Sequence, residues 1–299
     1  MASVRLDAVL SQLRAAMTPF LESLPADPLA RRSPEAIKVA LELLGPLYDR
    51  WFSPEIVGYE HLEGRQALVV GTHNGGNMAP DMFALMIACW RRFGAEFPAY
   101  GLAHDQVMRM PLVGDTIARL GAVPANPRNA AALLDRGATV LVYPGGDVDA
   151  FKPYRDRHVV RFGERTGFIK LALRAGVPIV PCISVGAHQT WMVLSDGREF
   201  AIRSGLKRLF RLETFPIFLA LPYGLGFGPV EAHLPVPSRL RLRLLPPMEL
   251  PGGPASADDP QHVRRLADHV RSTMQAELDA LVSEGDFGPL AQIRRWVGS

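Results

Sequence analysis

The stretch Ala67-Leu-Val-Val-Gly-Thr-His73-Asn-Gly-Gly-Asn-Met-Ala-Pro-Asp81 decides the fold of this chain. Its apolar first part predicts a buried β-strand over Ala67–Val70, and the apolar residues after Pro80 predict a helix over Asp81–Phe93. His73 and a Gly-Gly pair lie between the two elements. Because open α/β sheets bind ligands beyond the carboxyl ends of their strands, we expect a functional site at His73 and Asp81.

Strand-like and helix-like segments alternate along the chain around this stretch. Such alternation is typical of a largely parallel sheet with helices on both faces. We therefore expect a single α/β domain with a largely parallel mixed sheet over residues 55–250, a helical segment at 1–54 and a C-terminal helical extension at 251–299. The expected strands are Ile56–Tyr59, Ala67–Val70, Ala99–Leu102, Val140–Tyr143, Ile179–Val185 and Leu240–Leu245. The expected helices between them are Asp81–Phe93, Val107–Leu120, Asn129–Arg136 and Arg165–Arg174.

Amphipathic helices are also expected at both ends of the chain. The first is either packed on the core or an interfacial membrane anchor, and its apolar residues are Leu6, Val9, Leu10, Leu13 and Met17. A second helix begins at Ser33-Pro34-Glu35 and should reach about Trp51 with a kink at Pro46. The last helix begins at Asp259-Pro260, and we expect its apolar face to pack on the same domain.

Composition and charge limit the functional classes. The chain is 48% hydrophobic and carries a formal net charge of +3, so it is globular and nucleic acid is not an expected partner. Basic residues cluster at 152–165 and 203–211, which suits an anionic ligand or a membrane surface. Cys89 and Cys182 predict buried thiols in a reducing compartment, with neither a disulfide nor a metal site.

No secretory signal peptide is expected, because Arg5, Asp7 and Arg14 interrupt the apolar residues of the N-terminus. The apolar run from Phe215 to Val230 is shorter than the ~20 residues of a membrane-spanning helix and is rich in Pro and Gly. It fits either a loop that dips into a membrane surface or a loop buried over the sheet.

His73 and Asp81 together fit a general base. A carboxylate that accepts from one imidazole nitrogen fixes the tautomer and leaves the other nitrogen free to take a proton. The alternatives are a structural histidine satisfied by the backbone and a carboxylate that stabilises the helix dipole. The flexible turn of Asn74, Gly75 and Gly76 next to His73 favours the functional interpretation.

A second candidate turn is Tyr143-Pro144-Gly145-Gly146, which follows an expected strand. Its backbone N–H groups fit an oxyanion or phosphate site, or else Gly is needed there only for a tight turn. Cations follow at Lys152, Arg155, Arg157, His158, Arg161 and Arg165, and about half of them fit a solvated loop. Arg165 lies near a helix start, where a cation is unfavourable, so we expect a ligand or an acidic partner for it.

In combination, these segments resemble the glycerolipid acyltransferase superfamily, and are most similar to its actinobacterial-type and diacylglycerol-acyltransferase-like members. The resemblance covers roughly residues 55 to 250. His73 and Asp81 match the histidine–aspartate motif of the family, and Gly121-Ala-Val-Pro124 its acceptor-positioning block. Tyr143-Pro144-Gly145-Gly146 stands where the family has Pro-Glu-Gly, and Val177-Pro-Ile-Val-Pro181 matches the closing strand motif. The run Arg165-Thr-Gly-Phe-Ile-Lys170 is the most particular part of the likeness.

Two features depart from the family pattern. Four residues usually separate the His and the Asp, whereas here seven residues, Asn74 to Pro80, lie between them. Gly145 replaces the Glu of the second block, and Val148 stands near the expected Arg. Either Arg155, Arg157 or Arg165 then replaces that phosphate-binding Arg, or the acceptor is a neutral lipid alcohol.

The resemblance implies transfer of a fatty acyl group from an acyl thioester, acyl-CoA or acyl-ACP, to a hydroxyl of a glycerolipid or lysophospholipid. His73 and Asp81 would be catalytic, without a covalent intermediate, a metal or a cofactor. The expected substrate-binding residues are Asn74, Gly75, Gly76, Pro144, Gly145, Gly146, Arg155, Arg165 and Lys170. The expected location is peripheral on the cytoplasmic face of the cell membrane. A lipid hydrolase or thioesterase, and a lipid-binding protein without turnover, are the alternatives.

Overall fold

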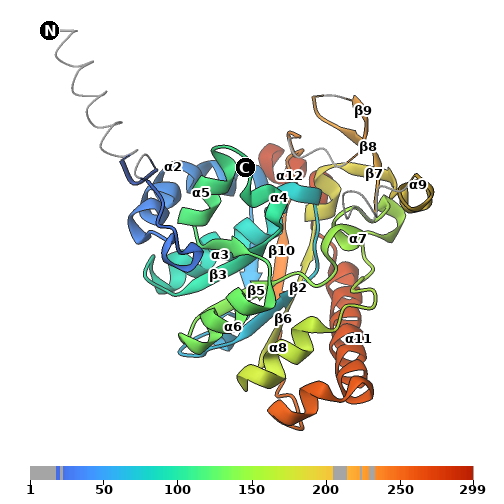
Figure 1. Cartoon of the computed structure of the whole chain (residues 1–299). Helices are drawn as coiled ribbons and strands as arrows, with labels where there is room; N and C mark the ends of the chain where they lie inside the picture. The colour runs from blue at the N-terminus through green and yellow to red at the C-terminus, as the bar shows by residue number, and fades with distance from the viewer. Residues whose placement is uncertain (1–17, 21–22, 205–213, 223, 229–232, 299) are drawn as a thin grey trace, which may run out of the picture.

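The computed structural model describes residues 18–20, 23–204, 214–222, 224–228 and 233–298. Its centre is a seven-stranded sheet with the order β1-β10-β6-β2-β5-β3-β4 (Figure 1). All neighbouring strands are parallel except β10 and β6. The predicted single α/β domain with a largely parallel mixed sheet is therefore confirmed. The strands are β1 (Glu55–Val57), β2 (Leu68–Gly71), β3 (Ala99–Ala103), β4 (Ala122–Pro124), β5 (Thr139–Val142), β6 (Ile179–Val185) and β10 (Arg241–Leu244).

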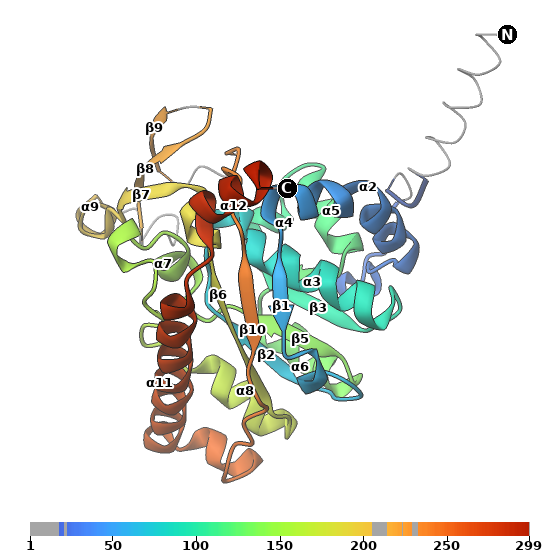
Figure 2. The same ribbon diagram turned by 180° about the vertical axis from the view of Figure 1, so that it is seen from behind.

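Helices cover both faces of this sheet because its central strands are apolar on both sides. In β2, Leu68 and Val70 lie in a core with the helices α6 (Pro127–Asp135), α8 (Gly167–Ala175) and α11 (Pro260–Glu284). Val69 faces the other core, with α2 (Pro34–Phe52) and α3 (Pro80–Phe93). Figure 1 and Figure 2 show the two layers on either side of the strands. The period-two alternation of a strand thus produces a three-layer arrangement.

Two predicted helices differ from the structure. The segment from Val107 to Leu120 forms two short helices, α4 (Asp105–Met108) and α5 (Val113–Arg119), because the chain turns at Pro111 and Leu112, with Leu112 at φ 65°. The helix expected at Arg165 begins later, since α8 starts at Gly167. In the N-terminal segment, α2 begins at Pro34, is capped by Ser33 and continues past Pro46 to Phe52. The first predicted helix, at 6–17, lies outside the described residues.

The segment expected as a loop at 215–230 instead contributes two strands to a second sheet. Its described residues form β8 (Ile217–Ala220) and β9 (Gly224–Phe227), which pair antiparallel with each other and with β7 (Met192–Ser195) in the order β7-β8-β9. Short apolar runs separated by Pro and Gly are as typical of a hairpin as of a loop, so the sequence did not distinguish them. One face of this sheet is buried through Val193 and Phe218 against Phe151 and Trp191.

The C-terminal part of the chain packs on the same sheet. Helix α11 lies against β6 and α8, with its apolar face buried at Val263, Leu266, Val270, Met274, Leu278 and Leu281. Helix α12 (Gly288–Val297) follows it. No helix in the described part of the chain has both the length and the apolar character needed to cross a bilayer.

The central strand β6 should carry much of the stability. Ile179 is fully buried between β2 and the helical layer. We expect Ile179→Ala to lower the free energy of unfolding by about 2–5 kcal/mol, because it removes apolar contacts and leaves a cavity. Val57→Ala, at an exposed edge-strand position, is the control and should cost less than about 1 kcal/mol. Urea unfolding of both variants provides the measurement, and equal losses would contradict this assignment of the core.

Candidate active site

His73 lies two residues beyond the end of β2, at the carboxyl edge of the parallel strands. Its backbone N–H donates a hydrogen bond of 2.6 Å to Asp149 Oδ2. Its ring lies beside the Tyr143 ring, with 5.2 Å between centroids. The chain at His73 is therefore attached to the segment that follows β5, the neighbouring strand.

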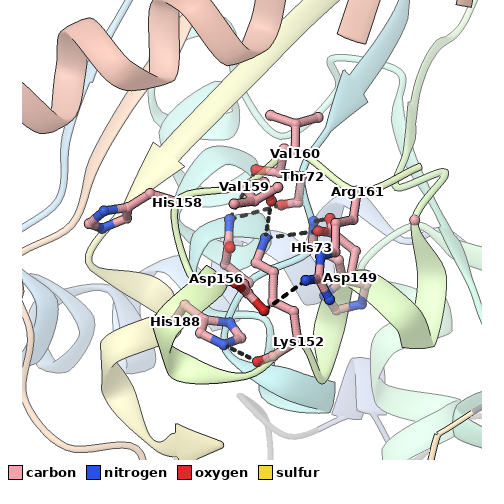
Figure 3. Close-up of polar contacts among 12 residues, drawn as sticks. Thr72, His73, Asp149, Lys152, Asp156, His158, Val159, Val160, Arg161 and His188 are labelled. Atoms are coloured by element: carbon pink, nitrogen blue, oxygen red, sulfur yellow. Dashed lines mark hydrogen bonds and ion pairs between the residues drawn. The ribbon is translucent and has the colours of Figure 1, made fainter. Parts of the chain in front are cut away.

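A fully buried ion pair forms this attachment (Figure 3). Lys152 Nζ donates to Asp149 Oδ1 at 2.8 Å and to the Val159 carbonyl at 3.1 Å, and both charged side chains have no exposed surface. Asp149 also accepts from the backbone N–H of Arg161. Burial raises the pKa of Asp149, and the Lys152 charge opposes that shift. Because each charge has a partner and further hydrogen bonds, the pair is stable away from water. Lys152, which the sequence placed among anion-binding or solvated cations, is thus an internal structural residue.

The His73 ring is held in its neutral form. Burial lowers the pKa of His73, the Lys152 charge acts in the same direction and Asp147 opposes both, so that the pKa falls to about 4. The side chain is nevertheless partly exposed. Its Nδ1 is buried without a hydrogen-bond partner among the described residues. Nε2 is not among the buried atoms without a partner, so on this partly exposed ring Nε2 is the nitrogen that can act as a general base on a substrate.

Asp81 lies in the first turn of α3 and belongs to a separate buried polar cluster. Its carboxylate accepts from Ser184 Oγ at 2.5 Å, from the Met82 N–H at 2.9 Å and from Asn74 Nδ2 at 3.3 Å. Asn74 also donates to Ser184 Oγ at 2.9 Å and to Thr72 Oγ1 at 3.0 Å. Burial raises the pKa of Asp81 to about 6 despite these hydrogen bonds. The cluster connects the end of β2 to α3 and β6.

The structure forms no hydrogen bond between the described atoms of His73 and Asp81. Thr72 and Asn74 make the contacts on the Asp81 side, whereas the His73 ring contacts Tyr143, as expected when successive side chains alternate in direction. The longer His–Asp spacing is taken up by a 3₁₀ turn at Gly76–Met78, after which Ala79 adopts φ 35°. A direct His73–Asp81 pair therefore stays a prediction.

The Pro144–Gly146 turn lies at the start of α7 (Gly146–Ala150). The Gly146 N–H donates to the Tyr143 carbonyl at 3.2 Å, so this expected anion donor is already occupied. The Gly145 N–H has no acceptor in the described part of the chain. Gly145 is itself buried, and a Cβ at this position would clash with the Arg161 carbonyl oxygen, so the missing acceptor does not make its N–H accessible.

Arg165 stabilises this turn. Its guanidinium donates to the Gly145 carbonyl at 2.5 Å, to the Pro144 carbonyl at 3.2 Å and to Asp147 Oδ1 at 3.0 Å. Arg165 directly precedes Thr166, the N-cap of α8, and the Asp147 carboxylate neutralises its charge there. The sequence predicted a ligand or an acidic partner for Arg165, and Asp147 is that acidic partner.

The other predicted cations are less engaged. Arg155 is 82% exposed, and its nearest carboxylate, Asp156, is 3.7 Å away. Lys170 lies partly exposed on α8, and its side chain makes no hydrogen bond or ion pair with a described residue. Neither residue is brought to His73 by a contact in this structure.

Sequence reasoning missed Ser184, Asp149 and Lys152 as parts of the site. Ser184 had a signal, since it is a hydroxyl within the otherwise apolar strand Ile179–Val185. The only sequence signal for Asp149 and Lys152 was their spacing of three residues, and in a segment expected to be a loop this spacing does not predict an ion pair. Their pairing depends on burial, which the local sequence does not reveal.

The buried ion pair gives a test of this geometry. We expect Lys152→Met to lower the free energy of unfolding by about 3–5 kcal/mol, because it leaves the Asp149 charge buried and unpaired. Lys38→Met, which removes an exposed lysine 3.5 Å from Glu96, should change stability by less than about 1 kcal/mol. Adding Asp149→Asn to Lys152→Met should recover part of the loss in urea unfolding. No recovery would show that packing of the lysine, and not its charge, is responsible.

Comparison with known proteins shows similarity to acyltransferases. Residues 53–185 match the protein family described as Acyltransferase. An uncharacterized protein of Mycobacterium tuberculosis is 32% identical over 243 residues, which are 81% of this chain and 65% of that protein. This chain thus spans just under two thirds of that relative. Diacylglycerol O-acyltransferase 1 of Eremothecium gossypii is 28% identical over 147 residues, 47% of this chain and 32% of the enzyme.

A solved structure has the same fold. The crystal structure of the 1-acyl-sn-glycerophosphate (LPA) acyltransferase PlsC from Thermotoga maritima superposes with a TM-score of 0.52 at 16% identity, and covers 94% of this chain and 98% of that one. The match of residues 53–185 to the Acyltransferase family, the diacylglycerol O-acyltransferase relative and the shared fold together support membership of the glycerolipid acyltransferase superfamily.

Proposed function

We propose that this protein transfers a fatty acyl group from an acyl thioester to a hydroxyl of a glycerolipid or lysophospholipid. The observation that carries the proposal is His73. It lies at the carboxyl edge of the sheet inside the acyltransferase-like segment and has a neutral, partly exposed ring.

In the proposed reaction, His73 removes the proton of the acceptor hydroxyl while the oxygen attacks the thioester carbonyl. The tetrahedral intermediate then collapses, its carbon–sulfur bond breaks, and the departing thiol takes the proton from the imidazolium. The chain needs no nucleophile of its own in this scheme. The donor to the oxyanion in this scheme is a backbone N–H of the Pro144–Gly146 turn, where the buried Gly145 N–H has no acceptor among the described residues.

Two carboxylates are candidates for stabilising the imidazolium. Asp81 matches the family motif, but its hydrogen bonds go to Ser184, Asn74 and Met82. Asp147 is the carboxylate whose charge raises the pKa of His73. We propose that Asp147 acts on the charge of the ring and that Asp81 holds the end of β2 in place through Asn74.

The acyl donor is either acyl-CoA or acyl-ACP, and the acceptor is either phosphorylated or neutral. For a phosphorylated acceptor, Arg155 is the exposed cation nearest in sequence to the Pro144–Gly146 turn, because Arg165 already holds that turn. For a neutral acceptor, no cation is required. We place the protein at the inner face of the cell membrane, where both kinds of acceptor occur.

The central test is His73→Ala. We expect transfer from radiolabelled acyl-CoA to lysophosphatidate, monoacylglycerol or diacylglycerol to fall by about 10²–10⁴-fold, because the general base is lost. His269→Ala, on the exposed face of α11, is the matched control and should retain full activity. Transfer that survives in His73→Ala would overturn the assignment.

The same assay separates the two alternatives. Release of free fatty acid at an equal rate without an acceptor would identify a hydrolase or thioesterase. Lipid binding without turnover by either the wild type or His73→Ala would identify a lipid-binding protein.

The two carboxylates can also be distinguished. Because Asp147 is the carboxylate that raises the pKa of His73, Asp147→Asn should lower the acidic apparent pKa of kcat/KM. Asp81→Asn should lower stability and kcat while leaving that pKa unchanged. A shift in Asp81→Asn alone would favour the direct pair of the family motif. The pH dependence of kcat/KM for both variants gives the answer.

The pH profile of the wild type should also differ from that of an ordinary histidine. A base works only when it is unprotonated, and burial lowers the pKa of His73 from 6.5 to about 4. Activity should therefore persist as the pH falls from about 7.5 to about 5, where a histidine with an unshifted pKa would be mostly protonated. A loss of activity centred near pH 6.5 in steady-state kinetics would contradict the neutral, desolvated ring.

A further inference from the structure

The β7-β8-β9 sheet has an apolar outer face. Its opposite face is buried through Val193, Phe218 and Ala220, and the residues that alternate with these point outward. Met192, Leu219 and Leu225 are aligned across the three strands, as are Ile217 and Phe227 across two. Leu225 is 53% exposed and Phe227 58%. We name Met192, Leu194, Ile217, Leu219, Leu225 and Phe227 the outer face.

This pattern is unusual for a sheet that meets water. An antiparallel sheet with one packed face normally has polar residues on the other. Here Ser195, the partner of Ile217 beyond the irregularity in β7, is the one polar residue that pairs with an outer-face residue in the described strands. Leu219 and Met192 are also more than a third exposed. A contiguous exposed apolar surface of this kind marks an interaction site.

The outer face belongs to one end of the molecule. Figure 1 and Figure 2 both show β7, β8, β9, α9 (Arg198–Arg203), α2, α4, α5 and α12 at this end, opposite α6, α8 and the start of α11. Apart from Val57 and Val159, all the exposed large apolar residues of the described chain lie on these elements or their connections. On α2 and α12 they include Leu47, Leu290 and Ile293.

His73 is at the same end. At the end of β2, Gly71 pairs with Cys182 of β6. At the end of β6, Val185 pairs with Arg241 at the start of β10. The start of β10 in turn bonds to the end of α2, through the Leu240 N–H and the Phe52 carbonyl. The carboxyl edge of the sheet, the end of α2 and α12 therefore share one side of the molecule.

Cations accompany the apolar residues at this end. Arg50, Arg294 and Arg295 line a shallow cavity of about 1010 Å³ between α2 and α12. Arg198 and Arg203 are exposed on α9, where Arg203 pairs with Glu199 at 2.7 Å. Exposed apolar side chains combined with arginines fit the boundary between lipid headgroups and acyl chains, particularly of anionic lipids.

We infer that this end of the molecule docks on an anionic lipid bilayer, with the outer face inserted among the lipids and His73 directed toward the membrane. The inference rests on the proposed function for one point, which is that the substrates are lipids. A bilayer fits better than a second copy of the chain, because the apolar residues are spread over separate elements with arginines between them. A bilayer adapts to such a surface, whereas a protein partner needs a matching shape.

Site-specific fluorescence can test the insertion. Both native cysteines are buried, so a cysteine introduced at Leu225 can be labelled selectively with an environment-sensitive dye. With vesicles of phosphatidylcholine and phosphatidylglycerol, we expect Leu225→Cys to give a blue-shifted emission. Val57→Cys, exposed to a similar degree and away from this end, should not shift. An unshifted signal at Leu225 with the protein bound to vesicles would overturn the inference.

Vesicle flotation of the full chain gives the energetic test. We expect the double variant Leu219→Gln/Leu225→Gln to bind these vesicles at least about tenfold more weakly, because two apolar side chains no longer leave water. Val57→Gln is the matched control and should bind like the wild type. Phosphatidylcholine alone should bind more weakly than the mixture. Equal binding of the double variant, or loss of a dimer in sedimentation instead of loss of vesicle binding, would refute the bilayer assignment.

The result of the membrane-docking test can be distinguished from the result of the acyl-transfer test. Vesicle binding requires no turnover, so His73→Ala should float like the wild type. The double variant should keep its activity on a short-chain acceptor dissolved in water. If neither the wild type nor any variant is active, but the double variant still binds vesicles more weakly than the wild type, the proposed function is contradicted and the docking inference is not.

Discussion

The ion pair between Lys152 and Asp149 fixes the centre of the site. One Asp149 oxygen accepts from Lys152 and the other from the backbone of His73, so the same carboxylate neutralises a buried charge and positions the candidate base. The lysine charge also disfavours protonation of the imidazole. A single buried pair thus holds the backbone of His73 and adds to the burial that keeps its ring neutral. It also joins the ends of β2 and β5. The pairing between these two strands extends only to Val70 and Val142.

The polar cluster of Asp81 has a complementary role on the other side of the same strand end. Through Asn74 and Ser184 it ties the turn after β2 to α3 and β6. The chain at residues 72–81 is therefore held from two sides by buried carboxylates, one at each face. This double attachment explains how a stretch with two consecutive glycines at positive φ, Gly75 and Gly76, keeps a defined course. It also gives Asp81 a structural reason to be present that does not require contact with His73.

The sequence predicted the sheet well because its strands are apolar on both faces and separated by amphipathic helices, so the pattern is local. Ile179–Val185 agrees with β6 residue for residue, and the largely parallel order follows from the alternation. The second sheet was not predicted, because apolar runs such as Ile217–Ala220 are short and are separated from one another by Pro and Gly. At the site, His73 was found from its place at a strand end. Its surroundings depend on contacts between residues distant in sequence, and Lys152 was misinterpreted because a lysine on a loop is normally solvated.

Trp191 connects the turn after His73 with the β7-β8-β9 sheet. Its ring lies over the turn at Gly76, contacts Phe151 at the end of α7 and Phe218 of the second sheet, and stacks on His233 at 4.6 Å between centroids. The indole is therefore a natural chromophore that contacts both the turn after His73 and the second sheet. Its near-ultraviolet circular dichroism reports on both neighbours at once, so a ligand that displaces either of them alters an optical signal that the unmodified chain already has.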